Sequence, residues 1–340
     1  MTRTLGLAAI VMVVLICVVA VIDSVIRLRA RRAERSEEQF RPGLEQSIAR
    51  YLAGSAESPS ATATGERDVL LRAALEALGD LRGSERMRLA DLLDRLGYVA
   101  EAAAALTARR RDVRRRAAET LAVIGTDGTL PALTAGLGDQ DPAVRCACAR
   151  PLAESGGKDV IEAVIATVSR DVRAVPGQSA AVVLALARRW PDALAPLLSR
   201  DAVPAARAMA VEVVGVLRLA QHQSLLRACL ADGDDLAASA ARGLGSIGAT
   251  GAVGELIGLA RDSQRAARTR QAAIVALGSI GDLDALPVLE SLLGSDDWSV
   301  AAAAARSLYE LGAAGVAVLH RASTCPQAGR REQAEAVLQQ

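Results

Sequence analysis

Aromatic side chains are scarce in this chain. Of its 340 residues only 2% are Phe, Trp or Tyr, whereas 51% are hydrophobic. The hydrophobic content therefore rests on Ala, Leu and Val, which suit helices that pack closely through small side chains. Sandwiches of β-sheets and doubly wound α/β sheets are disfavoured, because they depend on β-branched and aromatic residues. The composition predicts an all-α protein.

Lysine and histidine are also rare. Lys158 is the only lysine, and arginine supplies the rest of a basic content that nearly balances the acidic residues, at a net charge of +1. This balance gives no overall electrostatic attraction to nucleic acid. The two histidines, His222 and His320, have no recognisable catalytic partner in the sequence. We therefore predict no catalytic residue and no enzymatic activity.

The cysteines do not form a metal-binding pattern. Cys146 and Cys148 stand in a C-x-C arrangement, and the other three, Cys17, Cys229 and Cys325, are far apart. A zinc site needs a second pair of ligands at a suitable spacing. Buried thiols that pack as small hydrophobic groups are the simpler interpretation. We predict neither a metal ion nor a cofactor.

One long hydrophobic run differs from the rest of the chain. Thr4–Ile22 contains no charged residue over nineteen positions, enough for a helix to cross the hydrocarbon core of a bilayer. A cleaved signal peptide is the alternative, but its hydrophobic region is shorter and ends at a small-residue cleavage site, which is missing here. We predict a transmembrane anchor within residues 1–35, with residues 4–26 in contact with the bilayer.

Arginines after the hydrophobic run predict its orientation. The positive-inside rule places the N-terminus outside and the bulk of the chain in the cytoplasm, at the inner membrane of the cell. The same arginines are candidates for contact with anionic lipid headgroups. They are Arg27, Arg29, Arg31, Arg32 and Arg35.

Residues 36–66 are predicted to connect the anchor to the main domain. Leu44, Ile48 and Leu52 recur at helical spacing. They predict a short helix, which lies either on the bilayer or a partner, or on the domain that follows. Gly54–Glu66 has the small, polar composition of a flexible linker.

From residue 67 to residue 340 the sequence is repetitive. Glycine turns recur in one column, and a second column of residues lies twelve positions before each turn, at intervals of 28 to 34 residues. Two further units keep this spacing but replace the turn glycine by Trp190 and Arg218. Such a period predicts a solenoid, in which two-helix units bury their hydrophobic faces against one another. The second column is Val113, Val144, Gln178, Ala206, Leu236, Thr269 and Val300.

The segment Asp141–Arg145 (DPAVR), followed by a Leu-x-x-x-Gly turn, resembles HEAT repeats, particularly the short bacterial type related to phycobilisome lyases. The resemblance covers Gly83–Gln340. It implies a right-handed α-solenoid of about eight helical hairpins, preceded by the single transmembrane helix. It also implies that the arginine at the position of Arg145 ties adjacent repeats. Arg114, Arg207 and Arg270 occupy this position in other units, and Ser179, Ala237 and Ala301 interrupt the series.

The segment Gly243–Gly248 (GLGSIG) formally matches the dinucleotide-binding fingerprint G-x-G-x-x-G, with Asp262 nineteen residues after its first glycine. That fingerprint needs a strand before it, whereas Asp235–Arg242 is alanine-rich and helical in pattern. The pentapeptide LGSIG also recurs at Leu277–Gly281. We therefore interpret these glycines as part of the repeat, allowing close helix packing and a positive-φ helix end.

The densest charge in the chain lies at Arg109–Arg116, with six arginines in eight positions. This segment is a candidate docking patch for an acidic partner, phosphate or anionic lipid. The alternative is a solvated turn between repeats and one face of a helix. The candidate residues are Arg109, Arg110, Arg111, Arg114, Arg115 and Arg116.

A membrane-anchored solenoid is best suited to binding other proteins. We predict a scaffold or adaptor for an unidentified protein at or in the membrane, on its cytoplasmic side. One alternative is a chromophore-handling protein of the bilin-lyase type, which the resemblance implies. The other is a lipid- or nucleic-acid-binding module that uses Arg109–Arg116. Nucleic acid and small molecules are the less favoured ligands, because aromatic stacking platforms are few.

Overall fold

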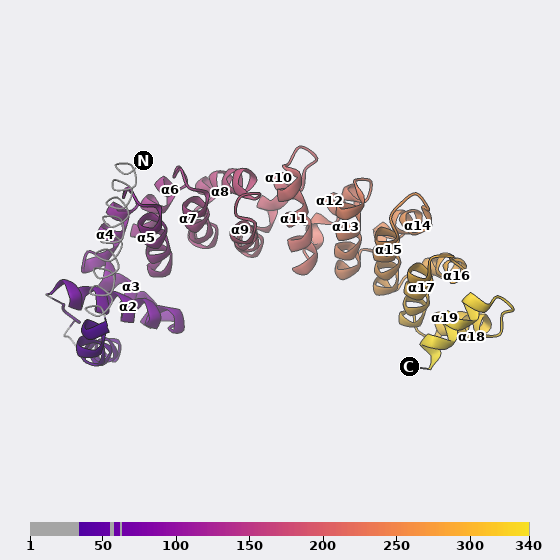
Figure 1. Cartoon of the computed structure of the whole chain (residues 1–340), viewed down its shortest axis with the longest axis horizontal. Coiled ribbons are helices and arrows are strands. Elements are labelled where there is room, and N and C mark those ends of the chain that lie inside the picture. Colours follow the sequence, from indigo (N-terminus) through magenta and orange to yellow (C-terminus); the bar gives the residue numbers. More distant parts are fainter. Residues whose placement is uncertain (1–33, 55–57, 62, 340) are drawn as a thin grey trace, which may run out of the picture. The chain divides into compact units, whose positions relative to one another are not determined.

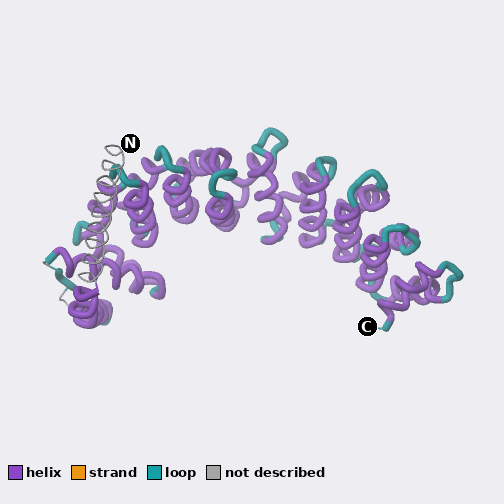
Figure 2. The backbone as a smooth tube through the Cα atoms, viewed as in Figure 1, coloured by secondary structure: helices purple, strands orange, loops and turns teal. Residues whose placement is uncertain are grey.

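The computed structural model describes residues 34–54, 58–61 and 63–339, and the regular structure within these ranges is entirely helical (Figures 1 and 2). The predicted all-α class is therefore confirmed. The chain divides into two compact units, Met1–Leu133 and Thr134–Gln340. Their boundary lies inside α6 (Leu130–Gly136), where no change in composition marks it.

The predicted anchor, Thr4–Ile22, lies outside the described residues together with four of the five arginines that flank it. The fifth, Arg35, is exposed on a helical segment, residues 34–52. Within the described ranges, no helix combines the length and the hydropathy needed to cross a membrane.

The first unit is built from short helices around the predicted juxtamembrane segment. Leu44 and Ile48 of the helical residues 34–52 are buried, and Arg41 of the same segment pairs with Glu76 of α2. This helix therefore packs on the helices that follow it, the second of the two predicted arrangements. The next helix begins at Thr64, inside the stretch predicted as a linker. The elements that follow residues 34–52 are α2 (Thr64–Asp80), α3 (Gly83–Arg95), α4 (Tyr98–Ala105), α5 (Arg111–Ile124) and η1 (Asp127–Thr129).

The second unit is a row of antiparallel helical hairpins. The first helix of each hairpin, which we call the A helix, packs beside the A helices of its neighbours, and the second, the B helix, lies in an adjacent row (Figure 1). Counted from α3 to α18, the described helices pair into eight hairpins, the number predicted, and α19 follows as a half-unit. The A helices of the second unit are α7 (Pro142–Ser155), α9 (Pro176–Arg189), α11 (Pro204–Val216), α13 (Asp234–Ile247), α15 (Ala267–Ile280) and α17 (Trp298–Glu310).

Apart from α8, the B helices of the second unit are shorter than the A helices, and several follow a single 3-10 turn. Proline occupies the first turn of α10 and of α16, where a missing N–H leaves no intrahelical bond unmade. The B helices and the remaining elements are α8 (Lys158–Asp171), η2 (Pro191–Leu194), α10 (Ala195–Leu198), η3 (Ala220–His222), α12 (Gln223–Cys229), η4 (Thr250–Ala252), α14 (Val253–Arg261), η5 (Leu283–Ala285), α16 (Leu286–Leu292), α18 (Ala313–Ser323) and α19 (Ala328–Leu338).

Neighbouring A helices approach one another through glycine and alanine. A Cβ added to Gly215 would lie 2.8 Å from the Cα of Gly243, and one added to Gly245 would lie 2.8 Å from the Cα of Ala276. The GLGSIG motif thus lies within α13 and the turn that ends it, where Gly248 has a φ of 76°. Its glycines serve close packing and the helix end, which confirms the repeat interpretation.

The close approach at Gly245 predicts a position-dependent effect of one methyl group. We expect Gly245→Ala to lower the free energy of unfolding by about 1–3 kcal/mol, because overpacking forces neighbouring backbones apart. The matched control is Gly254→Ala on α14, where nothing lies within 4 Å of an added Cβ. That change should raise the stability by up to about 1 kcal/mol. Thermal melting compares the two variants, and equal shifts would contradict the close contact.

Buried arginines join consecutive repeats, as the resemblance to HEAT repeats implied. Arg145 on α7 donates 2.6 Å to the carbonyl of Asp139, which follows the previous B helix, and 2.7 Å to Asp171 at the end of α8. The side chain of Arg145 is 10% exposed and that of Asp171 is 2% exposed. The hydrogen bond to Asp171 raises the pKa of Arg145, so the guanidinium stays charged despite its burial.

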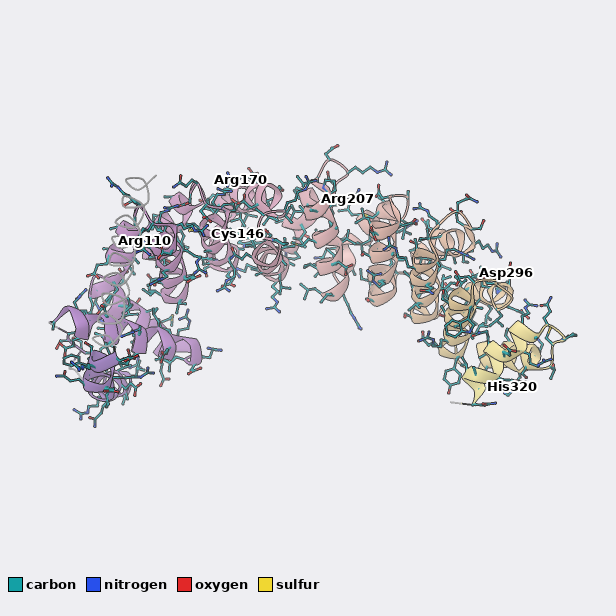
Figure 3. The ribbon with its side chains drawn as sticks, in the orientation of Figure 1. Arg110, Cys146, Arg170, Arg207, Asp296 and His320 are labelled. Carbon is teal, nitrogen blue, oxygen red and sulfur yellow. The ribbon has the colours of Figure 1, made fainter. Side chains whose placement is uncertain are left out.

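The same arrangement recurs in other repeats. Arg207 on α11, labelled in Figure 3, donates 3.1 Å to the carbonyl of Leu198, at the end of α10, and 2.8 Å to Asp232, which follows α12. Arg270 binds the carbonyl of Ala260 near the end of α14. Carbonyls at a helix end lack an intrahelical donor, so each arginine satisfies a group that the fold leaves unpaired.

Removal of the carboxylate opposite Arg145 should be strongly destabilising. We expect Asp171→Asn to lower the free energy of unfolding by about 3–5 kcal/mol, because it leaves a buried guanidinium without its counter-charge. Asp235→Asn is the control, since the side chain of Asp235 is 86% exposed in its pair with Arg268. That variant should stay within about 0.5 kcal/mol of the parent. Denaturant melts measure both, and a double change of Arg145→Met with Asp171→Leu should recover part of the loss.

Candidate protein-binding surface

The A helices of the second unit present one face away from the B helices. Two positions on each A helix carry this face, six and ten residues after the column that contains Val144. Residues four apart lie one above the other on a helix, so the two positions form parallel rows across the unit. We call this surface the A face. Its residues are Arg150 and Glu154, Leu184 and Arg188, Glu212 and Val216, Arg242 and Ser246, Val275 and Ser279, and Arg306 and Glu310.

Hydrophobic side chains are exposed on the A face. Val216 is 74% exposed and Val275 is 46% exposed, and Tyr309, next to this face on α17, is 51% exposed. These are among the few large hydrophobic residues that the described part of the chain leaves open to solvent. Exposed hydrophobic groups rimmed by charge are typical of protein interaction sites.

The charges on this face are unequally paired. Glu154 lies 3.8 Å from Arg150, and Glu212 lies 2.9 Å from Arg242. The guanidinium groups of Arg188 and Arg306 form no ion pair or hydrogen bond with another described residue, and neither does that of Arg218, beside the face at the end of α11. Two of the three glutamates on this face are therefore already paired with arginines. The three unpaired arginines outnumber the one remaining glutamate, so the unpaired charge is mainly positive.

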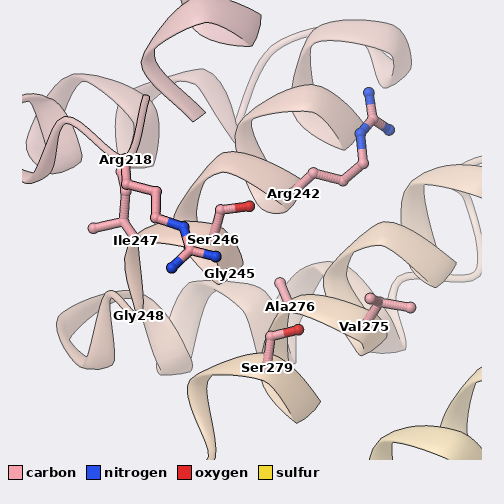
Figure 4. A pocket seen from close by; sticks show the side chains of 9 residues that line it. All are labelled: Arg218, Arg242, Gly245, Ser246, Ile247, Gly248, Val275, Ala276 and Ser279. Carbon is pink, nitrogen blue, oxygen red and sulfur yellow. The ribbon is translucent and has the colours of Figure 1, made fainter. Parts of the chain in front are cut away.

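A hollow of about 570 Å³ opens on the A face between α11, α13 and α15. Gly245 and Ala276 contribute no long side chain to its lining, while Ser246 and Ser279 bring hydroxyl groups. Figure 4 shows Arg218 extending toward Gly245 and Ser246, and Arg242 pointing away from it. The hollow therefore combines one unpaired guanidinium with two hydroxyls above a floor of small residues.

Arg218 holds an unusual backbone conformation. Its φ is 52°, and within the described ranges it is the one residue other than glycine with a positive φ. The equivalent positions in the following repeats are Gly248 and Gly281, with φ of 76° and 79°. The left-handed region is costly for a residue with a Cβ, and such strain occurs preferentially at functional sites.

A second hollow, of about 450 Å³, lies on the same face between α7 and α9. Arg150, Glu154 and Arg188 line it, with Leu184 among its hydrophobic residues. Arg189, also in its lining, lies 5.5 Å from the ring centroid of Trp190. The A face therefore offers two depressions at separate hairpins of one unit.

The family profile for HEAT repeats matches residues 99–187, 233–310 and 265–339 of the sequence, which together make up more than half of the chain. The chain belongs to the HEAT-repeat family. No curated protein was found to match it.

Solved structures of Kap121p have a similar HEAT-repeat fold. Kap121p bound to Ste12p is 14% identical, with a TM-score of 0.54 over 90% of this chain and 40% of that one. Kap121p bound to Pho4p is 13% identical, with a TM-score of 0.54 over 87% and 41%. Kap121p bound to Nup53p is 15% identical, with a TM-score of 0.53 over 90% and 40%. This chain thus spans less than half the length of Kap121p, and the likeness is one of fold.

The arginine patch predicted from the sequence lies at the start of one HEAT hairpin in the first unit, and its six members differ in depth. Arg114 is only 5% exposed, and it donates to the carbonyls of Ala108 and Arg109. Arg114 therefore holds the repeat junction and is not part of an exposed patch. The remaining five, Arg109, Arg110, Arg111, Arg115 and Arg116, are exposed.

Acidic neighbours partly neutralise the exposed arginines of this patch. Asp112 lies 2.9 Å from Arg110 and 3.6 Å from Arg116, and Glu119 lies 3.4 Å from Arg115. Hydrogen bonding from Arg110 lowers the pKa of Asp112, so that the carboxylate keeps its charge in mildly acidic solution. The exposed arginines of the patch therefore lie on a partly paired helix face.

His222, Cys146 and Cys229 have structural surroundings, whereas His320 is exposed on α18. His222 is buried with its Nε2 atom 2.7 Å from the carbonyl of Pro191. Cys146 lies 3.8 Å from the hydroxyl of Ser179, and Cys229 accepts a 3.2 Å contact from Arg207. Among the described residues, no group of three or more potential ligands is placed to hold a metal ion.

Burial should make these thiols unreactive. It raises the pKa of Cys148 to about 12, and it also raises the pKa of Cys146 and Cys229, so the thiolate is scarce near neutral pH. We expect a brief pulse of iodoacetamide at pH 8 to leave these three cysteines unlabelled in the native protein. Cys325, which is partly exposed, is the internal control. Peptide mapping by mass spectrometry measures each site, and equal labelling at all four would contradict the packing.

Proposed function

We propose that this HEAT-repeat protein is a membrane-anchored scaffold that binds another protein through the A face of its second unit. The observation that carries the proposal is the A face itself. It combines unpaired arginines, exposed hydrophobic side chains and two hollows on one regular surface. Arginine and hydrophobic anchors are the residues enriched at the centre of protein interfaces.

The similarity to Kap121p supports a protein partner. The three structures named above show that protein bound to Ste12p, Pho4p and Nup53p. A row of helical hairpins offers a long surface on which a partner makes many separate contacts. The same kind of surface in this chain supports binding rather than catalysis.

The sequence supports the place of action. Thr4–Ile22 has the length and composition of a transmembrane helix, and the arginines after it favour a cytoplasmic location for the repeats. An anchor raises the effective concentration of the scaffold near other proteins of the same membrane. We therefore place the partner at the cytoplasmic face of the inner membrane.

Two other functions remain predictions from the sequence. A bilin-handling activity rests on the resemblance to lyase-type repeats alone. Binding of lipid or nucleic acid through residues 109–116 is less favoured, because Arg114 is buried and three of the exposed arginines are paired.

Site-specific photo-crosslinking in the native cell tests the scaffold proposal. A photoreactive residue at Ser246 or Ser279 on the A face should capture a discrete membrane-associated protein. The same residue at Ser224, exposed on the B helix α12, should not. Mass spectrometry identifies the captured chains. Capture at Ser224 but not at the A face would contradict the choice of surface.

The anchor is tested with the same crosslinking variants. The full chain should remain in the membrane fraction after washing at alkaline pH, whereas a chain without residues 1–35 should not. Loss of the anchor should also reduce capture at Ser246, because the local concentration of the partner falls. A full chain released by the alkaline wash would show that the segment is not a transmembrane anchor.

A further inference from the structure

We propose that the A face binds an acidic, extended segment of its protein partner, and that Arg218 holds one carboxylate of that segment in the hollow between α11, α13 and α15. This inference rests on the proposed function and specifies the chemistry of the partner.

The charge of the A face complements that of an acidic segment. The guanidinium groups of Arg188 on α9, Arg218 after α11 and Arg306 on α17 form no ion pair or hydrogen bond with any other described residue. Two of the three glutamates on the face are held by arginines of the same face, Glu154 by Arg150 and Glu212 by Arg242. The third, Glu310, lies at the α17 end of the face. A partner that meets this face with acidic side chains forms new ion pairs without breaking existing ones.

Arg218 has a backbone conformation that glycine adopts more easily. A glycine at this position would adopt the left-handed region without strain, as Gly248 and Gly281 do. Arginine brings a long side chain into the hollow instead, beside Gly245 and Ser246 (Figure 4). A guanidinium presents two parallel N–H groups that match the two oxygens of a carboxylate, and the hydroxyls of Ser246 and Ser279 supply further donors.

The position of the hollow favours a carboxylate over a phosphate group. It lies near the ends of α11, α13 and α15, since its lining includes Arg218, Ile247 and Ser279. The C-terminal ends of helices carry partial negative charge, which stabilises a guanidinium but opposes a doubly charged anion. One unpaired guanidinium therefore suits a single carboxylate.

The spacing of the A helices matches the advance of an extended chain. Packed helices lie about 8–10 Å apart. An extended chain advances about 3.3 Å per residue, so about three residues cross each A helix. Acidic residues three positions apart would then reach Arg188 and Arg218, while hydrophobic residues that alternate with them contact Val216 on α11 and, further along the segment, Val275 on α15. A segment that continues to Arg306 on α17 spans about fifteen residues by the same spacing.

A synthetic peptide tests the inference on the full chain in detergent. The probe is a fluorescent fifteen-residue peptide with Asp at every third position and Ser and Val between them. Its control is the same peptide with Asn in place of Asp. We expect the Asp peptide alone to bind, with an affinity that falls as salt is raised, since the new ion pairs lie at the surface. Equal binding of the Asn peptide, or no binding of either, would overturn the proposal.

Arg218→Gly separates recognition from folding. This change removes the guanidinium and also the backbone strain, so the melting temperature should be unchanged or higher. Affinity for the Asp peptide should fall about ten- to hundredfold, as expected for loss of a charge-assisted hydrogen bond. The control is Arg261→Gly, since Arg261 is exposed at the end of the B helix α14. Equal losses from the two changes would overturn the assignment of Arg218.

Two further outcomes distinguish this inference from the scaffold function. Vesicles of phosphatidylcholine with phosphatidylglycerol should not displace the bound peptide. Displacement by them would make the occupant a lipid surface and overturn the inference. A protein captured at Ser246 with equal yield from the parent and from Arg218→Gly would leave the scaffold function intact and reject the acidic segment.

Discussion

The close approach of neighbouring A helices is the constraint on which the rest of the second unit depends. At Gly245 the space between α13 and α15 does not admit a single methyl group, and at Gly215 the same holds between α11 and α13. Side chains on the flanks of these helices must therefore be small, which explains a composition rich in alanine and poor in aromatic residues. On the A face, long side chains such as Arg188 and Arg306 extend into solvent. The A face is thus a consequence of the packing.

A second constraint arises where one hairpin meets the next. Each B helix ends in carbonyls that no intrahelical N–H reaches, and the neighbouring A helix covers them. Arg207 donates to such a carbonyl, that of Leu198, and Arg145 donates to the carbonyl of Asp139 in the turn after α6; each also binds a carboxylate with its remaining donors. Burying an ion pair contributes little net stability, but it ties the ends of two successive B helices to one A helix. These arginines therefore set the register between repeats, which packing of alanine alone specifies weakly.

The fold could be predicted from the sequence because the same turn glycines and the same column of residues recur in successive repeats. The turn glycines set the register, and the register alone gives the hairpins and the buried arginine position. The same register places Arg114 in the column of Arg145, so the sequence is sufficient to predict that Arg114 is buried. The density of charge in residues 109–116 does not distinguish Arg114 from the five exposed arginines around it. The A face was harder to find, because alanine on all sides of a helix blurs the boundary between its buried and exposed faces.

Trp190 and Arg218 replace the turn glycine in consecutive repeats, and their different conformations bear on the role of Arg218. Trp190 ends α9 with a φ of −133°, so an A helix of this chain can end without the left-handed conformation. Arg218 keeps that conformation although it has a Cβ. Absence of glycine therefore does not force the strain at Arg218. The hollow beside α13 and α15 lies where this backbone directs the guanidinium, and a strained residue that aims an unpaired charge at a cavity is better explained by what it binds than by what it stabilises.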